Sequence, residues 1–257
     1  MTPRGFIIHF TARSGSTFVI FTLMQHPQIK ARAEVFGASK LPGNLEQSDQ
    51  NQIAFLRRFM RPYRLETPGY DGISRGFKIQ IARESQQIRN VNRYVKVANQ
   101  YDLAKFFLYR TNRVKQVISA FRARQVKALT KEMNSIERAH VFDAETHQKV
   151  GKLPKISVTP EHLIRALEKL DDSYKGLESL KIKMGGGIDL FYEDSITERQ
   201  QFFDGIFREI GVHTIDVTRT DETKKITSEN LVDVIENFDE VHTRLRGTRY
   251  EAQLMGN

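Results

Sequence analysis

The chain has 257 residues, of which 39% are hydrophobic and 28% charged, as is typical of a globular protein with one substantial core. It contains no cysteine, which excludes disulfide bonds and thiolate chemistry. No stretch approaches the roughly 18 uninterrupted apolar residues of a membrane span, and the start lacks the apolar core of a signal peptide, so we expect a cytoplasmic protein. The absence of a long linker rich in Pro, Gly or Ser predicts a single domain over residues 1–257.

The net charge of +9 is unevenly distributed. Residues 57–131 contain 18 Lys or Arg and four acidic residues, so the rest of the chain is net acidic. A basic middle fits an anionic small ligand, an anionic acceptor or a nucleic acid about equally well, and its cluster Arg57–Arg64 is typical of a solvated face. A nucleic-acid-binding module is therefore one hypothesis, although no recognised DNA- or RNA-binding motif supports it.

The first predicted elements are a buried strand over residues 6–10 and a helix over residues 18–24. The strand is indicated by its run of β-branched and aromatic residues, and the helix by an apolar run that Pro27 would end. A short loop of small and polar residues joins them. A strand, a small-residue loop and a helix in this order direct backbone N–H groups and the positive end of the helix dipole toward an anion.

The residues of this loop suit phosphate or sulfate binding. Gly15 lets the backbone approach a ligand, and Arg13 offers a charged, forked set of donors. The hydroxyls of Ser14, Ser16 and Thr17 add further donors. The loop differs from a Walker A loop, because the first glycines of that motif are missing and no Lys precedes Ser16. This difference disfavours an ordinary kinase, although a small-molecule kinase with a divergent loop stays as an alternative.

The middle of the chain predicts an alternation of strands and helices. Residues 37–70 carry three prolines and indicate an irregular segment facing the ligand or closing over it, with a possible helix over residues 52–60. A strand, a polar helix and another strand are then predicted over residues 77–81, 83–99 and 105–109. The alternation predicts an α/β fold with a mostly parallel sheet flanked by helices. Sites in such sheets lie at the carboxyl ends of the strands. The loop that contains Arg13 and, separately, Arg110 both follow such strand ends.

The next helix is predicted to begin after Asn112, a suitable cap, and to bury Val114, Val117, Ile118 and Phe121. Arg110 would lie at the strand end and Ser119 two turns into the helix. Both could reach one anion only if the helix packs alongside the loop.

The last third of the chain predicts further helices around one strand. Residues 122–158 are a variable segment, in which His140 and His147 lack metal-ligand spacing and are expected at the surface. The later elements are a helix starting at Thr159–Glu161, a strand over residues 188–192, a capping box at Ser195–Glu198 with a helix closed by Gly211, and a helix over residues 228–245. The arginines that follow, including Arg246, are expected in a solvated tail.

Four runs near the start of the chain carry a resemblance to a known family. They are Arg13-Ser-Gly-Ser-Thr17, the apolar helix after it, His26-Pro27-Gln-Ile29 and Ala33-Glu34-Val-Phe36. Together they resemble the amino-terminal region of sulfotransferases that use 3′-phosphoadenosine-5′-phosphosulfate (PAPS), and are most similar to the bacterial branch of trehalose and nodulation-factor sulfotransferases. Residues 189–212 and the tail resemble the same branch, whereas residues 37–70 and 122–158 are poorly covered.

This resemblance implies an enzyme that moves the sulfuryl group of PAPS to a hydroxyl of a carbohydrate, glycolipid or secondary metabolite. It implies that the loop Arg13, Ser14, Gly15, Ser16 and Thr17 holds the 5′-phosphate, with Arg13 stabilising the leaving charge. It also implies that Arg110 and Ser119 bind the 3′-phosphate. The acceptor stays open, because Glu34 stands in Arg32-Ala-Glu-Val-Phe and not in the Pro-Glu-Glu of trehalose-type members.

The resemblance also implies that Glu34 is the base that takes the proton of the acceptor hydroxyl. His9 and His26 are competitors, but His9 lies inside a predicted strand and His26 at a helix end, which are typical positions for structural histidines. No metal is expected, since the implied mechanism needs none and the chain lacks the Asp-rich ligand sets of a Mg²⁺-dependent kinase. The apolar face of the last helix would permit a homodimer.

Overall fold

The computed structural model describes residues 3–37, 40–60, 73–81, 87–132, 153–217 and 230–256. The chain divides into two compact units. The first unit comprises residues 1–109 and 172–219, and the second comprises residues 110–171 and 220–257. The single domain expected from the sequence stays a prediction. Among the described residues, no helix is both long and apolar enough to cross a membrane.

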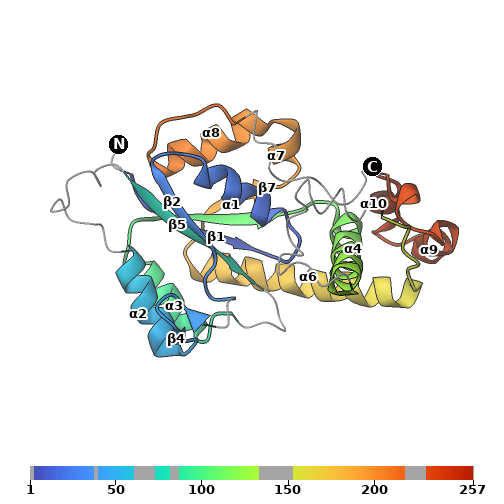
Figure 1. Ribbon diagram of the computed structural model, residues 1–257, viewed down its shortest axis with the longest axis horizontal. Coiled ribbons are helices and arrows are strands. Elements are labelled where there is room, and N and C mark those ends of the chain that lie inside the picture. Colours follow the sequence, from blue (N-terminus) through green and yellow to red (C-terminus); the bar gives the residue numbers. More distant parts are fainter. Residues whose placement is uncertain are drawn as a thin grey trace. The chain divides into compact units, whose positions relative to one another are not determined.

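A parallel sheet forms the centre of the first unit (Figure 1). In the described part of the chain it has five strands in the order β2-β5-β1-β6-β7, and every neighbouring pair is parallel. The strands are β1 (Gly5–Phe10), β2 (Ile29–Glu34), β5 (Ser74–Gln80), β6 (Leu103–Tyr109) and β7 (Ile188–Phe191). The parallel sheet predicted from the alternation of strands and helices is thereby confirmed.

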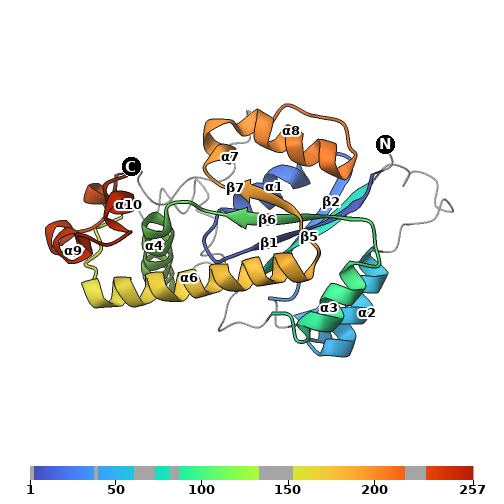
Figure 2. The same cartoon turned by 180° about the vertical axis from the view of Figure 1, so that it is seen from behind.

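Helices of the first unit cover both faces of this sheet (Figures 1 and 2). One face carries α1 (Ser16–Met24) and α8 (Arg199–Ile210), and the short α7 (Asp194–Thr197) precedes α8. The opposite face carries α2 (Asp49–Met60), α3 (Val91–Ala98) and the second part of α6 (Pro160–Lys183). Near α2, the short strands β3 (Lys40–Leu41) and β4 (Leu45–Glu46) form an antiparallel pair. The flanking helices complete the α/β architecture expected from the sequence.

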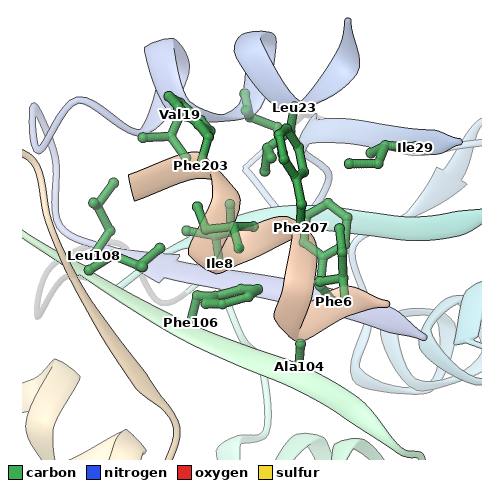
Figure 3. Packing of buried hydrophobic residues seen from close by; sticks show 14 of the residues in the cluster. Phe6, Ile8, Val19, Leu23, Ile29, Ala104, Phe106, Leu108, Phe203 and Phe207 are labelled. Carbon is green, nitrogen blue, oxygen red and sulfur yellow. The ribbon is translucent and has the colours of Figure 1, made fainter. Parts of the chain in front are cut away.

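Alternate side chains of β1 and β6 build the core beneath α1 and α8 (Figure 3). Phe6 and Ile8 of β1 and Phe106 of β6 reach this face, where Leu23 of α1 and Phe207 of α8 meet them. All five side chains are fully buried. Because burial of a large apolar side chain contributes about 1.5–3 kcal/mol, this cluster fixes the position of α1 over the sheet.

The loop after β1 lies where the strand order of the sheet reverses. From the central strand β1 the chain passes to β2 and β5 on one side, and afterwards to β6 and β7 on the other. The reversal therefore falls between β1 and β6. Ligands of parallel α/β sheets bind at the carboxyl ends of the strands beside such a point. The fold thus places residues 11–15 at the position favoured for a ligand.

Three elements of the first unit differ from the sequence prediction. β2 was not predicted. The polar helix over residues 83–99 is shorter than predicted, because residues 87–90 lie outside any helix and the side chain of Asn90 caps α3 by accepting from the N–H of Arg93 at 3.1 Å. The capping box at Ser195 is wrong, since Ser195 lies inside α7 and donates to the carbonyl of Tyr192 at 2.5 Å. Gly211, with φ 75°, closes α8 as predicted.

The second unit is helical in its described part. It contains α4 (Arg113–Glu132), the first part of α6, the 3₁₀ turn η1 (Leu231–Asp233), α9 (Phe238–Leu245) and α10 (Glu251–Met255). The cap predicted at Asn112 is confirmed, because its Oδ1 accepts from the N–H of Lys115 at 2.8 Å.

The predicted helix over residues 228–245 is wrong as one element, because η1 and α9 are separated around Asn237. The side chain of Asn237 bonds both the N–H and the carbonyl of Val158, at 2.9 and 3.0 Å. A side chain that satisfies the backbone of a distant segment ends the helix, although the apolar spacing continues. His140 and His147 lie outside the described residues.

Candidate functional site

Arg13 and Gly15 shape the loop after β1 by adopting left-handed backbone conformations. Their φ angles are 61° and 87°. The N–H of Ser14 donates to the carbonyl of Thr11 at 3.3 Å and closes a turn with Arg13 at its third position. A non-glycine residue in this region costs about 1–2 kcal/mol, and such conformations concentrate at ligand sites. The surrounding fold therefore holds Arg13 in a conformation that the isolated loop would avoid.

Gly15 is required where the loop enters α1. A Cβ at this position would lie 2.0 Å from Cδ2 of Tyr192, so the tyrosine ring packs directly against the glycine. Gly15 is the N-cap residue of α1 and makes no side-chain cap hydrogen bond. The first N–H groups of a helix have no acceptor within the helix, and together with the helix dipole they attract anions. The loop thus presents an uncapped helix start at the carboxyl end of β1.

Ser14 adds a second, independent sign of a ligand. Its side chain is fully buried, and its Oγ has no hydrogen-bond partner among the residues that the structure describes. A buried hydroxyl without a partner costs about 1–3 kcal/mol, so such groups are rare in folded proteins. An oxygen of a bound anion would satisfy this donor. The predicted role of Ser14 in anion binding is consistent with this placement.

Lys78 is the site residue that the sequence analysis missed. Its Nζ donates to Oγ1 of Thr17 at 2.9 Å and to Oγ of Ser16 at 3.2 Å, and it lies 5.0 Å from the centroid of the Phe10 ring. Lys78 is only 2% exposed. Burial lowers its pKa, the neighbouring Glu34 carboxylate raises it, and the positive charge of Arg13 lowers it again. The start of α1 therefore has two cations near it, Lys78 at Ser16 and Thr17 and Arg13 in the loop before the helix.

The strand pattern explains why Lys78 points at the loop. β5 lies between β2 and β1, so both of its edges are hydrogen-bonded and it is an interior strand of the sheet. Phe77 packs against Phe36 and Phe55 on one face, whereas Gly76 leaves room for the ring of Phe6 on the other. Side chains of a strand alternate, so Lys78 shares the face of Gly76, beneath α1. A lysine in an interior strand is the signal that would have found it, because an unpaired ammonium is almost never buried.

A β-bulge brings Glu34 opposite Lys78. In the register of β2 and β5, Arg32 pairs with Phe77 and the next pair is Glu34 with Lys78, so Ala33 is the extra residue. Bulges change the direction of side chains and are frequent beside active sites. Oε1 of Glu34 lies 3.5 Å from Nζ of Lys78. The carboxylate is also fixed by Gln87, whose Nε2 donates to Oε2 at 3.3 Å, while the side chain keeps 34% of its exposure.

His9 and His26 are structural residues, as their positions in the sequence suggest. Nε2 of His9 accepts from the hydroxyl of Tyr94 at 2.7 Å, and its Nδ1 lies 3.3 Å from the carbonyl of Phe106. Burial lowers the pKa of His9 to about 3, so the ring is neutral near pH 7. His26 donates from Nε2 to the carbonyl of His213 at 2.7 Å and accepts the N–H of Gln28 at Nδ1. Glu34 therefore stays the base that the resemblance implies.

Arg110 and Ser119 lie in the second unit, the first between β6 and α4 and the second about two turns into α4. They are 6% and 7% exposed. The carbonyl of Arg110 accepts from Nη1 of Arg113 at 2.7 Å. Asn112 donates from Nδ2 to the carbonyl of Gln253, and the side chain of Gln253 accepts the N–H of Arg113. Helix α10 therefore fixes the backbone that follows Arg110.

Two arginines near the end of the described chain, Arg244 and Arg249, contact acidic residues of the second unit while their side chains stay exposed. Nη2 of Arg249 contacts Oδ2 of Asp171, which also accepts the hydroxyl of Tyr250. Arg244 lies 3.5 Å from Glu161. In the ranges that the structure describes, no group of three His, Cys, Asp or Glu residues has the arrangement of a metal site.

Comparisons with known proteins gave matches among solved structures only. No family model matches the chain, and no curated protein matches it. A mouse sulfotransferase, SULT7A1 complexed with PAP, is 13% identical, with 98% of this chain and 87% of that chain covered and a TM-score of 0.45. A sulfotransferase from Alicyclobacillus acidocaldarius is 14% identical, with coverage of 100% and 98% and a TM-score of 0.44. The sulfotransferase domain of the Synechococcus PCC 7002 olefin synthase is 12% identical, with coverage of 88% and 79% and a TM-score of 0.43.

Proposed function

We propose that this protein is a sulfotransferase that moves the sulfuryl group of PAPS to a hydroxyl of a carbohydrate, a glycolipid or another secondary metabolite in the cytoplasm. The observation that carries the proposal is the loop after β1, beside the reversal point of the sheet. There, among the residues that the structure describes, the buried hydroxyl of Ser14 has no hydrogen-bond partner, Gly15 provides no side-chain cap for α1, and Lys78 adds a cation. The choice of PAPS as donor is supported by the resemblance of residues 13–17 and 33–36 to the family.

The proposed reaction is an in-line transfer between two oxygens. The acceptor oxygen forms a bond to sulfur while the bond from sulfur to the bridging oxygen breaks. The electron pair of that bond stays on the 5′-phosphate, and the proton of the acceptor hydroxyl goes to the Glu34 carboxylate. As in phosphoryl transfer, the protein mainly positions the reactants and stabilises the charge that develops on the leaving group. Arg13 and the N–H groups at the start of α1 supply that stabilisation.

We assign Arg110 and Ser119 to the 3′-phosphate of the donor. A guanidinium and a hydroxyl are donors that suit a phosphate, and both residues are held by the fold of their unit rather than extended into solvent. The 3′-phosphate distinguishes PAPS from ATP and AMP. Arg110 should therefore decide between nucleotides, whereas Arg13 should bind the phosphate that they share.

Calorimetric titration with 3′-phosphoadenosine-5′-phosphate (PAP), ATP and AMP tests this assignment. We expect PAP to bind best, and Arg13→Ala and Arg110→Ala each to weaken it about 10- to 150-fold, as expected for a lost charged hydrogen bond. Arg93→Ala is the matched control, because Arg93 is paired with Asp49 on exposed helices of the first unit. Failure of PAP to bind, or tighter binding of ATP with Mg²⁺, would overturn the proposal.

Transfer of labelled sulfate from PAPS to a panel of hydroxyl acceptors then tests the base. Glu34→Gln should lower the rate about 10²- to 10⁴-fold, the usual contribution of a general base. The exposed Glu46 on β4 provides the control, and Glu46→Gln should transfer at the normal rate. Equal rates for the two variants would remove Glu34 from the mechanism.

Lys78 gives the kinase alternative a specific observation in its favour. A Walker A loop uses a lysine from its own sequence to reach the phosphates, and this loop has none. Lys78 supplies an ammonium at Ser16 and Thr17 from a different strand. The ATP titration with Mg²⁺ therefore distinguishes a kinase, which would bind ATP, from a sulfotransferase, which would bind PAP. The sulfotransferase proposal is preferred because the resemblance to the family also implies roles for Arg110, Ser119 and Glu34.

A further inference from the structure

The side-chain amide of Gln87 links the carboxylate of Glu34 to the end of β5. Its Nε2 donates to Oε2 of Glu34 at 3.3 Å, and its Oε1 accepts the backbone N–H of Gln80 at 3.1 Å. Because a backbone N–H needs an acceptor, the bond from Gln80 decides which end of the amide is Oε1. The opposite end, Nε2, therefore has to face the carboxylate. The backbone of the sheet thus sets the orientation of the amide that contacts Glu34.

Helix α2 fixes the backbone of Gln87 through a second amide. Gln52 of α2 is only 3% exposed, and its Nε2 donates to the carbonyl of Gln87 at 2.6 Å. The same side chain donates to Oε1 of Gln47 and accepts the N–H of Arg89, both at 3.0 Å. A buried amide with partners at both ends holds one conformation. Gln87 is therefore fixed at its backbone and at its side chain, and one amide N–H is directed at Glu34.

Gly37 leaves the space in which this contact is made. A Cβ at residue 37 would lie 2.6 Å from Nε2 of Gln87 and 3.1 Å from Oε2 of Glu34. Gly37 is not one of the glycines with a positive φ, so its backbone conformation does not require a glycine. The close approach of the amide and the carboxylate explains the missing side chain instead.

We infer that Gln87 is a positioning residue for the base Glu34, and that Gly37 provides the room for this contact. The inference rests on the proposed function, because it concerns the step in which Glu34 takes the proton of the acceptor hydroxyl. Lys78 lies 3.5 Å from Oε1 and Gln87 donates to Oε2, so both oxygens are held and the plane of the carboxylate is fixed. Each oxygen keeps a further lone pair that can accept the proton.

An amide suits this role because it is neutral. A general base has to lie within hydrogen-bond reach of the proton that it takes. A second cation beside Glu34 would favour the carboxylate over its protonated form and so oppose proton uptake, whereas an amide orients the carboxylate without adding a charge. Misplacement of a reacting group by about 1 Å can lower a rate about 100-fold. Gln87 therefore acts on the rate through the position of Glu34.

The test measures sulfate transfer from PAPS to the acceptor panel together with calorimetric PAP binding. Gln87→Met removes both amide bonds at similar side-chain length, and it should lower kcat about 10- to 100-fold. PAP affinity and the KM of the acceptor should change by less than about 2-fold, because only the proton transfer is affected.

Gly37→Ala is a second variant, which leaves both polar groups in place. The added methyl group would displace Nε2 of Gln87, so kcat should fall about 3- to 30-fold. Thermal unfolding should show little change, since the displaced atom is the end of a flexible side chain. A normal kcat in a folded Gly37→Ala protein would overturn the role of Gly37.

Gln200→Met and Gly205→Ala are the matched controls. Gln200 also donates from Nε2 to a carboxylate, Oδ1 of Asp204 at 2.8 Å, and accepts a backbone N–H, that of Val217 at 3.0 Å. These partners belong to α8 and the segment after it. A Cβ at Gly205 meets nothing within 4 Å. Both controls should transfer sulfate at the normal rate, and equal losses in Gln87→Met and Gln200→Met would assign the effect to the fold.

Two further measurements tie the effect to Glu34. In a Glu34→Gln background, Gln87→Met should lower the rate by less than about 2-fold more, because residues that act as a unit are not additive. Gln87→Glu keeps the bond from Gln80 but places a second carboxylate beside Glu34. Like charges disfavour ionisation, so the pH at which the rate is half-maximal should rise by about 1 unit. Multiplied losses and an unchanged pH profile would overturn the positioning role.

The outcomes separate this inference from the proposed function. If the unmodified protein binds PAP and transfers sulfate while Gln87→Met keeps its kcat, the inference fails and the sulfotransferase proposal stands. If Gln87→Met weakens PAP binding as much as it lowers kcat, Gln87 belongs to the donor site and the positioning role is overturned. If the unmodified protein neither binds PAP nor transfers sulfate, the proposed function fails and the inference fails with it.

Discussion

Nζ of Lys78 lies 3.5 Å from Oε1 of Glu34, and a β-bulge at Ala33 creates this pairing. Without the extra residue, Ala33 would stand opposite Lys78 and Glu34 would be turned to the other face of the sheet. The same bulge therefore places Glu34, which is the proposed base and also the ion-pair partner of the buried Lys78. The position of the Glu34 carboxylate near the loop therefore depends on one bulge in the edge strand β2.

Lys78→Met is expected to have a free energy of unfolding equal to that of the unmodified protein or up to about 2 kcal/mol higher. The methionine removes the ammonium that burial disfavours and puts an apolar end beside the ring of Phe10. Glu34 stays hydrated because its side chain is partly exposed. Urea unfolding measures the difference. A loss of more than about 2 kcal/mol would mean that the lysine is retained for the fold.

Ser14→Ala is expected to leave stability unchanged or to raise it by up to about 1 kcal/mol, because the deleted hydroxyl has no partner among the described residues. The same change should weaken PAP binding, since the donor that the anion would satisfy is gone. Thermal unfolding and calorimetry on one preparation check both parts. Ser195→Ala is the comparison, because the Ser195 hydroxyl donates to the carbonyl of Tyr192. If Ser14→Ala proves as destabilising as Ser195→Ala, then Oγ of Ser14 has a structural partner.

Gly15→Ala is expected to destabilise the loop and abolish PAP binding. Its φ of 87° disfavours a side chain, and the added Cβ would overlap the ring of Tyr192. Gly205 on α8 is the matched control, because a Cβ there meets nothing within 4 Å. Gly205→Ala should raise stability by about 0.5–1 kcal/mol through the helix preference of alanine. Calorimetric denaturation of both variants measures these changes in stability. An unchanged stability of Gly15→Ala would show that the loop can adopt another conformation.

Stability is expected to fall as the pH drops below about 6.5, in part because of His9. Burial lowers the folded-state pKa of His9 to about 3, whereas the unfolded chain titrates near 6.5. Between these values the unfolded state binds one more proton than the folded state, so stability is complete above pH 6.5 and decreases toward pH 3. The slope for one proton is about 1.4 kcal/mol per pH unit.

His9→Gln should reduce that slope by about one proton, as urea unfolding at several pH values would show. His26 is also held below its ordinary pKa by burial, so His26→Gln should reduce the slope in the same direction. The two variants together separate the contributions. An unchanged slope in His9→Gln would mean that His9 is protonated in the folded protein and that its bond to Tyr94 is reorganised.

The sequence by itself determined those helices and strands in which the spacing of apolar residues shows which side chains are buried. Phe6–Phe10, the run up to Met24 and the alternation after Gly76 predicted β1, α1 and β5 and thereby a parallel sheet. The small residues of the loop, with Arg13 before them, predicted an anion site at the carboxyl end of β1. These features depend on side-chain size and periodicity, which can be read from neighbouring residues.

Only the tertiary structure decided which distant residues complete the site. Lys78 is a polar residue of the strand predicted over residues 77–81, and its burial follows from the packing of α1 over this face of β5, a long-range contact that no local pattern encodes. The bulge that aims Glu34, and the packing of Tyr192 on Gly15, likewise join segments far apart in the chain. Asn237 ended a helix that its apolar spacing favoured, because its side chain found partners on Val158. Hydrogen bonds and charges act between residues that folding brings together, so their effects appear only once the sheet order is fixed.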